Sequence, residues 1–140
     1  MHRRESVIAL ALAGAGLAPP AWSAGPTVEV FTLSTLPLTN VRDAVVYYVD
    51  TISLLKQQLS TGLPPDPRRA QALATQRIAS LGAQLQSQAR AGANGLARAA
   101  QLGVQRAPAI VFEGRWVVYG LTDVDAARRV YSGLAARDRR

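Results

Sequence analysis

Apolar residues in the last third of the chain fall into two short, closely spaced runs. Ala109–Phe112 and Trp116–Tyr119 are rich in β-branched and aromatic residues, and only Glu113–Arg115 separates them. Two such runs at this distance are typical of a β-hairpin. Pro108 has no backbone N–H to give to a strand ladder, so we expect it just before the first hairpin strand. The segment Gly103–Gly120 therefore predicts a hairpin that is entered through a proline.

Two further strands are predicted near the start of the chain. Thr27–Thr32 alternates, which places Val28 and Val30 on one face of a strand and Glu29 on the other. Ala44–Val49 is a continuous apolar run of β-branched and aromatic residues. Such a run is typical of a strand buried on both faces, as in a parallel sheet. A short helix fits the same run, and the pattern alone leaves that alternative open.

A first helix is predicted directly after these strands. Asp50 or Thr51 can cap its start, and Gly62 ends it. Its apolar stripe consists of three residues at helical spacing: Ile52, Leu55 and Leu59. The segment between the two strands, Leu33–Asp43, is irregular and is predicted as a loop with room for a helical turn.

A longer helical stretch is predicted from Asp66 onward. Asp66–Pro67 combines a capping carboxylate with a proline in the first turn. The apolar stripe that follows consists of Ala70, Ala74, Ile78, Leu81 and Leu85. Gly92–Gly95 predicts a break, because glycine weakens a helix interior. Leu96–Leu102 then predicts one more short helix.

The last helix is predicted after the hairpin. Thr122 and Asp125 form a near capping box, with aspartate in place of the usual glutamate. Its apolar stripe consists of Val124, Ala127, Tyr131 and Leu134. Residues 137–140 are predicted to be a basic tail. The order of elements is therefore strand, loop, strand, helices, strand, strand and helix.

The composition excludes several kinds of functional site. The 140 residues suit one domain. The chain has no cysteine, so it can form no disulfide, no thiolate nucleophile and no zinc site of the cysteine type. The single histidine, His2, lies in the predicted leader described below. A mature chain without it has no histidine-based metal site and no Ser-His nucleophile pair.

The first residues have the features of a secretory signal peptide. Arg3–Arg4 supplies a positive start, and Val7–Ala18 is an apolar run. Small side chains at Ala21 and Ser23 offer a cleavage site. An uncleaved anchor is the alternative, but the run is shorter than the roughly 20 residues that a spanning helix needs. We expect residues 1–24 to be a signal peptide, export to the periplasm, and no transmembrane segment after cleavage.

The carboxylates are explained by structural roles. Five of them fall at predicted element ends, where helix capping and turns account for them: Asp43, Asp50, Asp66, Asp123 and Asp125. Glu29 lies inside a strand, where a salt bridge with an arginine is a simpler role than general-base catalysis. We therefore predict no catalytic residue, no metal site and no cofactor, and a protein that is not an enzyme.

The basic residues leave a binding function open. The formal net charge of +7 becomes +6 when Arg3, Arg4 and Glu5 leave with the signal peptide. The arginines that could form a basic face are Arg68, Arg69, Arg77, Arg90, Arg98, Arg106, Arg128 and Arg129. Such a face could meet DNA, anionic lipid or an acidic partner. Aromatic residues do not interleave with these arginines, so a solvated surface is the simpler interpretation.

The element order resembles a thioredoxin-like fold. The resemblance rests on Val28–Thr32 as the first strand, Ala107–Pro108 before the third strand, the Glu113–Arg115 turn, Gly120 and the last helix. It implies an α/β domain over residues 25–136, with a helical insertion at about residues 66–102. It also implies a cis peptide bond before Pro108, where trans is the common state.

The chain departs from active thioredoxins at the redox motif. That motif follows the first strand, and here the region reads Ser34–Leu38. Pro37 matches the motif proline, which leaves Thr35 and Leu38 where the cysteines would be. Neither side chain can exchange disulfides, so thioredoxin-type redox activity is excluded on chemical grounds.

A closer resemblance covers nearly all of the predicted mature chain. It rests on Val28–Thr32, Leu59–Pro67, Gln76–Arg77 and Ala107–Val124. These segments together resemble a family of integrating conjugative element proteins of unassigned biochemical role. That family is similar to the thioredoxin-like TrbC proteins of conjugative transfer. The resemblance implies a periplasmic, non-enzymatic part of a conjugative type IV secretion system, which acts through contacts with other proteins of the conjugation apparatus.

The thioredoxin-like resemblance also implies where such contacts would form. Folds of this kind bind extended polypeptide beside the proline loop and after the first strand. The predicted polypeptide-docking groove consists of Thr35, Leu36, Pro37, Leu38, Arg106, Ala107 and Pro108, with Trp116 on a nearby rim. In the alternative, these loops only maintain the fold, and the partner contacts the inserted helices. A basic nucleic-acid-binding accessory protein of DNA transfer is the alternative function.

Overall fold

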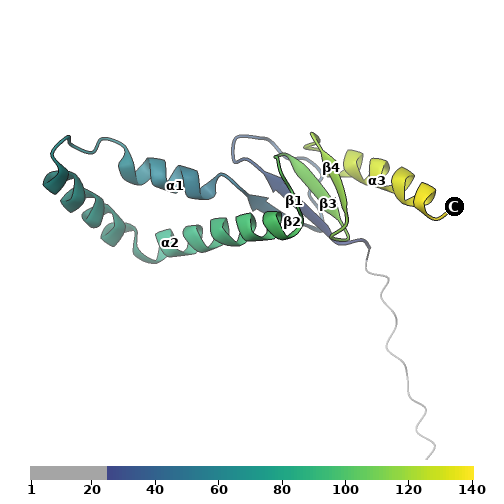
Figure 1. The fold of residues 1–140 in the computed structure, drawn as a ribbon, viewed down its shortest axis with the longest axis horizontal. Coiled ribbons are helices and arrows are strands. Elements are labelled where there is room, and N and C mark those ends of the chain that lie inside the picture. The colour runs from purple at the N-terminus through teal and green to yellow at the C-terminus, as the bar shows by residue number, and fades with distance from the viewer. Residues whose placement is uncertain (1–24) are drawn as a thin grey trace, which may run out of the picture.

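A computed structural model describes residues 25–140, which form four strands and three helices. In chain order these elements are β1 (Val28–Thr32), β2 (Ala44–Tyr48), α1 (Thr51–Ser60), α2 (Pro67–Gln101), β3 (Ala109–Phe112), β4 (Trp116–Tyr119) and α3 (Val124–Asp138). The sheet has the order β2-β1-β3-β4 and lies in the middle of an elongated molecule (Figure 1). The predicted signal peptide lies outside the described residues.

The pairing of the strands agrees with the predicted element order. β1 and β2 are parallel, with Val28 opposite Ala44. β1 and β3 are antiparallel, and so are the two strands of the predicted hairpin, β3 and β4. This arrangement confirms the α/β class and is compatible with a thioredoxin-like core that contains no cysteine.

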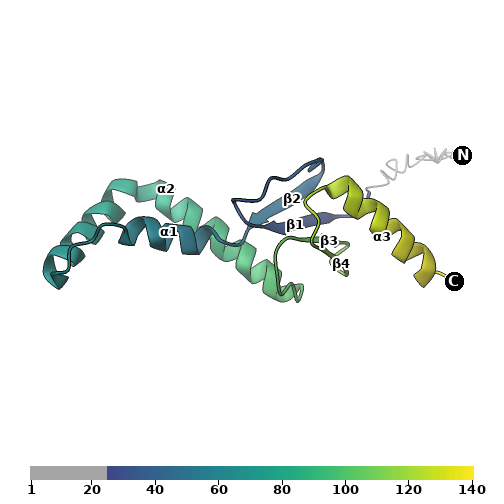
Figure 2. The ribbon, with the colours of Figure 1, turned by 90° about the horizontal axis from the view of Figure 1, so that it is seen from above.

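Each face of the sheet is covered by a different helix, as the ribbon seen from above indicates (Figure 2). The face covered by α3 has a core of Val28, Val30, Ile110, Phe112, Val118, Val124 and Ala127. The face covered by the end of α2 has a core of Phe31, Ala99, Ala109 and Val111. The alternation predicted for Thr27–Thr32 is thereby confirmed, because alternate residues of β1 enter different cores.

β2 is more exposed than its apolar run suggests. The prediction of a strand buried on both faces is wrong, since Val45 is 54% exposed and Tyr48 is 46% exposed. β2 lies at the edge of the sheet, so it has a neighbouring strand on one side alone. Val46 and Tyr47 still pack against the two cores from opposite faces, which explains the lack of polar residues between them.

α1 and α2 form a helical hairpin that projects from the sheet (Figure 1). We call residues 51–91 of this hairpin the arm. The predicted break at Gly92–Gly95 is wrong, because α2 runs unbroken through these residues. Both glycines are buried where α2 passes other segments closely. A Cβ at Gly92 would lie 3.0 Å from Ile52 Cδ1. α2 bends instead at Gly82, whose φ of 43° and ψ of −122° are not helical.

The loop between β1 and β2 contains a turn and no helix within the described chain. Leu36 N donates to Leu33 O at 3.0 Å and closes that turn. Farther along the loop, Thr39 joins the start of α3. Its N–H donates to Thr122 O at 3.0 Å, and its carbonyl accepts from Val124 N at 3.1 Å. The loop is therefore held against the sheet face that α3 covers.

The N-terminal cap of α2 is the residue that the sequence predicts, whereas the cap of α3 is a different residue. Asp66 caps α2, since its carboxylate accepts from Arg69 N at 2.8 Å. The predicted capping box at Thr122 and Asp125 is wrong. Asp123 caps α3 instead and accepts from the backbone N–H groups of Asp125 and Ala126. No helix among residues 25–140 combines the length and apolar character of a membrane span.

Candidate functional site

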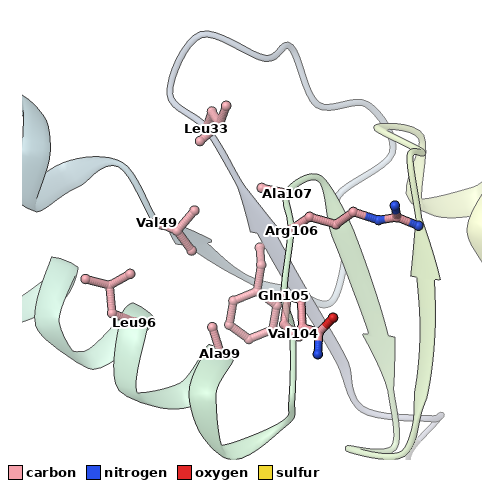
Figure 3. A pocket seen from close by; sticks show the side chains of 9 residues that line it. Leu33, Val49, Leu96, Ala99, Val104, Gln105, Arg106 and Ala107 are labelled. Carbon is pink, nitrogen blue, oxygen red and sulfur yellow. The ribbon is translucent and has the colours of Figure 1, made fainter.

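An apolar cavity opens at the end of the sheet where β1 and β2 finish and the proline loop enters β3 (Figure 3). Its volume is about 290 Å³. The residues that line it are Phe31, Leu33, Val49, Leu96, Ala99, Val104, Gln105, Arg106 and Ala107. No carboxylate is among these lining residues of the described chain. The cavity is therefore suited to an apolar side chain.

The sheet topology brings these segments together. Leu33 follows β1 and Val49 follows β2, and the carboxyl ends of parallel strands meet at one edge of a sheet. Ala107 precedes β3, which runs antiparallel to β1 and so begins at that same edge. Val49 N donates to Thr32 O at 2.9 Å, which holds the two chain segments beside each other.

Leu96 and Ala99 of α2 close the side of the cavity opposite the proline loop (Figure 3). They are three residues apart and therefore lie on one face of the helix. Ala99 is buried against Phe31 and Val111, whereas Leu96 is 44% exposed. Leu96 is thus an apolar side chain on the rim that a bound molecule could cover.

The backbone of the proline loop is open to a partner. The Ala107–Pro108 peptide bond is cis, as the resemblance implied. Pro108 O accepts from Gly120 N at 3.0 Å, which ties the loop to the end of β4. Within residues 25–140, no hydrogen bond involves the backbone groups of Arg106 or Ala107. These peptide groups can pair with an extended polypeptide, as unpaired edge groups of a sheet do.

The Arg106 side chain turns away from the cavity toward β4 (Figure 3). Its guanidinium carbon lies 4.8 Å from the centre of the Tyr119 ring, a cation–π geometry. Within residues 25–140 it makes no ion pair. Arg106 therefore places an unneutralised positive charge beside the proline loop.

Asp50 stabilises the loop after β1. Its carboxylate accepts from the backbone N–H and the hydroxyl of Ser34, at 3.0 and 2.7 Å. Partial desolvation pushes the pKa of Asp50 upward, but the hydrogen bonds from Ser34 outweigh it and keep the pKa below its ordinary value. Of the two predicted capping residues, Asp50 is at the N-cap position of α1, but its carboxylate accepts from Ser34 and makes no capping hydrogen bond. The hydroxyl of Thr51 donates to Tyr48 O and does not cap the helix.

The predicted docking residues are only partly brought together. Arg106 and Ala107 line the cavity, and Pro108 adjoins it. Thr35, Leu36 and Pro37 lie beyond Leu33 in the loop and do not line the cavity. They form or flank its exposed turn. Leu38 packs against the opposite core, under α3. The loop residue in contact with the cavity is therefore Leu33, which comes immediately after β1.

Trp116 does not fit the predicted rim. In the hairpin register, Phe112 pairs with Trp116, whereas Ala109 pairs with Tyr119. Trp116 is thus at the end of the hairpin far from Pro108. It packs against the core under α3, and the Arg115 guanidinium lies 5.2 Å from its ring centre. The aromatic residue of the hairpin that lies near the proline loop is Tyr119.

The salt bridge expected for Glu29 is confirmed. Arg98 Nε and Nη2 donate to the two carboxylate oxygens of Glu29 at 2.7 and 2.8 Å. The pair joins the end of α2 to the middle of β1 on the sheet face that also carries Phe31. Glu29 is thereby committed to a structural contact. No group of three or more metal-ligating residues occurs within residues 25–140.

Some cavity residues were missed because they carry no chemical signal in the sequence. Leu33 directly follows the first predicted strand, and that position was the available clue. Val49 was predicted as the last residue of its strand, whereas β2 ends at Tyr48. Leu96 and Ala99 were placed on a separate short helix after an expected break. Their role depends on α2 being continuous, which brings its last turns back onto the sheet.

Comparison with known proteins gives one family. No curated protein and no solved structure matches the chain. A family model described as "Protein of unknown function (DUF1525)" matches residues 25–137, which span every strand and nearly all of α3. The chain belongs to this DUF1525 family.

Proposed function

We propose that this protein is a non-enzymatic, periplasmic component of an integrating conjugative element that helps to assemble a conjugative type IV secretion apparatus. In this role it docks an extended polypeptide segment of another protein of the apparatus. The assignment to this apparatus is based on the resemblance to the family of integrating conjugative element proteins, which is similar to the TrbC proteins. The observation that carries the docking activity is the apolar cavity beside the unpaired peptide groups of Arg106 and Ala107.

The cavity and the loop offer two complementary kinds of contact. Backbone groups at Ala107 can pair with those of an extended segment, which gives affinity without regard to its sequence. One apolar side chain of that segment can enter the cavity between Leu33 and Leu96. Burying such a side chain contributes about 1.5–3 kcal/mol. Neither contact needs a cysteine, so docking is compatible with the loss of redox chemistry.

The proposal also places the mature protein in the periplasm. Its basis is the positive start, apolar run and small residues of the predicted signal peptide, residues 1–24. Mass spectrometry of periplasmic extracts should find an N-terminus near Ala24 or Gly25. Recovery of the uncut chain from the cytosol would contradict export.

The function is tested by complementation of conjugative transfer. Deleting the gene should reduce transfer, and the wild-type gene should restore it. Leu96→Glu should restore transfer poorly, because a carboxylate on the rim opposes entry of an apolar side chain. Val130→Glu is a matched control, since Val130 of α3 is 45% exposed against 44% for Leu96 and does not line the cavity.

The outcomes distinguish a role in conjugation from docking at the cavity. Unchanged transfer in the deletion strain would contradict a role in conjugation. Full restoration by a folded Leu96→Glu protein would contradict docking at the cavity while leaving the machine role in place. Folding of both variants is checked by circular dichroism and by their abundance in the periplasm.

A further inference from the structure

The arm buries little of its own apolar surface. Within the described chain, Leu55 is the buried residue of α1, and α2 has none between Pro67 and Ala91. The apolar residues of α2 in the arm that are half-buried are Ala70, Leu73, Ala74, Leu81, Leu85 and Ala89. Two helices alone cannot cover each other's apolar stripes, which in a bundle face a third or fourth helix. The seam of the arm therefore remains partly open.

An apolar crevice follows this seam on one flank of the arm. It has a volume of about 420 Å³ and is lined by Ile52, Leu55, Lys56, Leu59, Ser60, Leu85 and Ala89. The α1 residues Ile52, Leu55 and Leu59 are three and four positions apart, as on one face of a helix. Leu85 and Ala89 repeat that spacing on α2. The crevice thus lies between an apolar stripe of α1 and an apolar stripe of α2, and a third helix could pack in the groove between them.

The charge of the arm is almost entirely of one sign. Asp66 is the single acidic residue in the sequence from Thr51 to Gln101. The basic residues of that segment are Lys56, Arg68, Arg69, Arg77, Arg90 and Arg98. Arg98 pairs with Glu29, and Arg77 donates to the carbonyls of Leu59 and Thr61 at the end of α1. Within residues 25–140 the others form no ion pair.

We propose that the α1–α2 crevice docks an acidic amphipathic helix of a partner protein. The apolar lining selects the apolar stripe of such a helix, and Lys56 on the crevice wall pairs with a flanking carboxylate. α1 has ten residues, about 15 Å, so the docked helix spans roughly three turns. This surface is separate from the cavity beside Pro108 and goes beyond the polypeptide docking assigned to that cavity.

The charge of the arm and the lining of the crevice favour an acidic helix over a second copy of the chain and over a nucleic acid. A second copy of the chain would bring another basic arm against the first, and like charges in an interface oppose association. A nucleic acid would require cations gathered along its phosphates and aromatic side chains for its bases. The crevice instead has one cation, Lys56, and six neighbours that are apolar or hydroxyl-bearing.

The proposal is tested with a phage-displayed library of randomised helix-forming peptides selected on the purified protein. Enriched peptides should carry apolar residues three and four positions apart, with Asp or Glu beside them. Leu85→Gln and Lys56→Glu should each weaken the binding of a selected peptide, by about tenfold for the apolar change. Arg90→Glu is the matched control, because it changes the charge of the arm equally but lies outside the crevice. Its affinity should stay within about twofold of the wild type.

Several outcomes would overturn the proposal. These are enrichment of no peptide above the bare support, enrichment of peptides without acidic residues, and equal weakening by Lys56→Glu and Arg90→Glu. A dimer in analytical ultracentrifugation that Leu85→Gln dissociates would assign the crevice to a second copy. Binding of duplex DNA in competition with the peptide, and equally sensitive to both charge reversals, would assign the arm to nucleic acid. A negative result in the transfer assay would leave this binding measurement unaffected.

Discussion

The pairing of Arg98 with Glu29 shows how one contact joins the arm-bearing helix to the sheet. The Glu29 side chain is 12% exposed, whereas that of Arg98 is 39% exposed. Removing the arginine therefore leaves a largely buried carboxylate without its partner, while removing the carboxylate leaves a cation that can reach water. The cost of breaking the pair should depend on which partner is lost.

We expect Arg98→Met to lower the free energy of unfolding by roughly 1–3 kcal/mol, because it leaves Glu29 unpaired. Glu29→Gln should cost less, since the glutamine oxygen still accepts from Arg98. Asp138→Asn is the control, because the Arg115–Asp138 pair is exposed and should contribute little. Urea unfolding followed by circular dichroism measures all three. Equal losses for Arg98→Met and Glu29→Gln would contradict this assignment.

Asp123 makes stability depend on pH. Its carboxylate accepts from Asn40 Nδ2 and from the backbone N–H groups of Ala126 and Asp125. The hydrogen bond from Asn40, followed by those of the cap, lowers the pKa of Asp123 below its ordinary value of 3.8. A lowered folded-state pKa contributes stability above 3.8 that is lost as the pH falls through the folded-state value.

We therefore expect Asp123→Asn, which keeps a capping side chain, to lose less stability in acid than the wild type. The two unfolding free energies should differ by a constant amount at neutral pH and converge as the pH falls through 3.8 to the lower folded-state pKa of Asp123. Urea unfolding at a series of pH values measures this. A constant difference across the whole range would show that the Asp123 carboxylate does not titrate differently on folding.

Residue patterns predicted capping in this region but not which residue provides it. Thr122, Asp123 and Asp125 are all capping types and lie within one turn. The parallel contact of Thr39 with Asp123 and the hydrogen bond from Asn40 fix Asp123 at the start of α3. Those contacts come from a loop about eighty residues earlier in the chain, which local sequence cannot reveal.

At the scale of elements, α2 shows why the glycines at positions 92 and 95 led to a wrong prediction of a helix break. The intrinsic cost of glycine in a helix predicted a break at Gly92–Gly95. Both residues are instead required by close packing: a Cβ at Gly92 would be 3.0 Å from Thr51 Cβ, and one at Gly95 would be 3.2 Å from Tyr47 Cβ. The gain from bringing α2 onto α1 and β2 offsets the propensity cost, and it depends on neighbours that are distant in the sequence.

Two glycine-to-alanine changes should therefore differ in their effect on stability. Gly133 lies in α3, where an added methyl group would meet no neighbouring atom, so Gly133→Ala should stabilise the protein by about 0.5–1 kcal/mol. Gly92→Ala should fall below that variant by about 1–3 kcal/mol, because Thr51 and Ile52 must move. Thermal and urea unfolding measure both changes. An equal gain at both positions would contradict close packing at Gly92.

At the scale of the whole molecule, the sequence predicted the order of the strands along the chain, the parallel β2 and the β3–β4 hairpin, but not the antiparallel pairing of β1 with β3. The projection of the arm could not be predicted, because it depends on the close contacts of Gly92 and Gly95 with Thr51, Ile52 and Tyr47. The candidate site was predicted in part. Arg106 and Ala107 lie at it because the proline marks the entrance to β3. Trp116 does not, because the hairpin places its two ends at opposite edges of the sheet.

The elongated shape separates the two proposed docking surfaces. The cavity beside Pro108 is at the sheet, and the crevice is on the arm. The arm extends away from the sheet (Figure 1). α2 contributes to both, through Leu96 at the cavity and Leu85 at the crevice. One long helix thus connects the two proposed docking sites.

We propose that another protein of the conjugation apparatus docks at the cavity beside Ala107–Pro108. The most direct test of this claim is site-specific photocrosslinking in cells that carry the whole conjugative element. A photoreactive amino acid at position 96 should form a covalent adduct with a protein encoded by the element. The same amino acid at position 130, which is equally exposed but away from the cavity, should not. No adduct at position 96, or the same adducts at both positions, would contradict the claim.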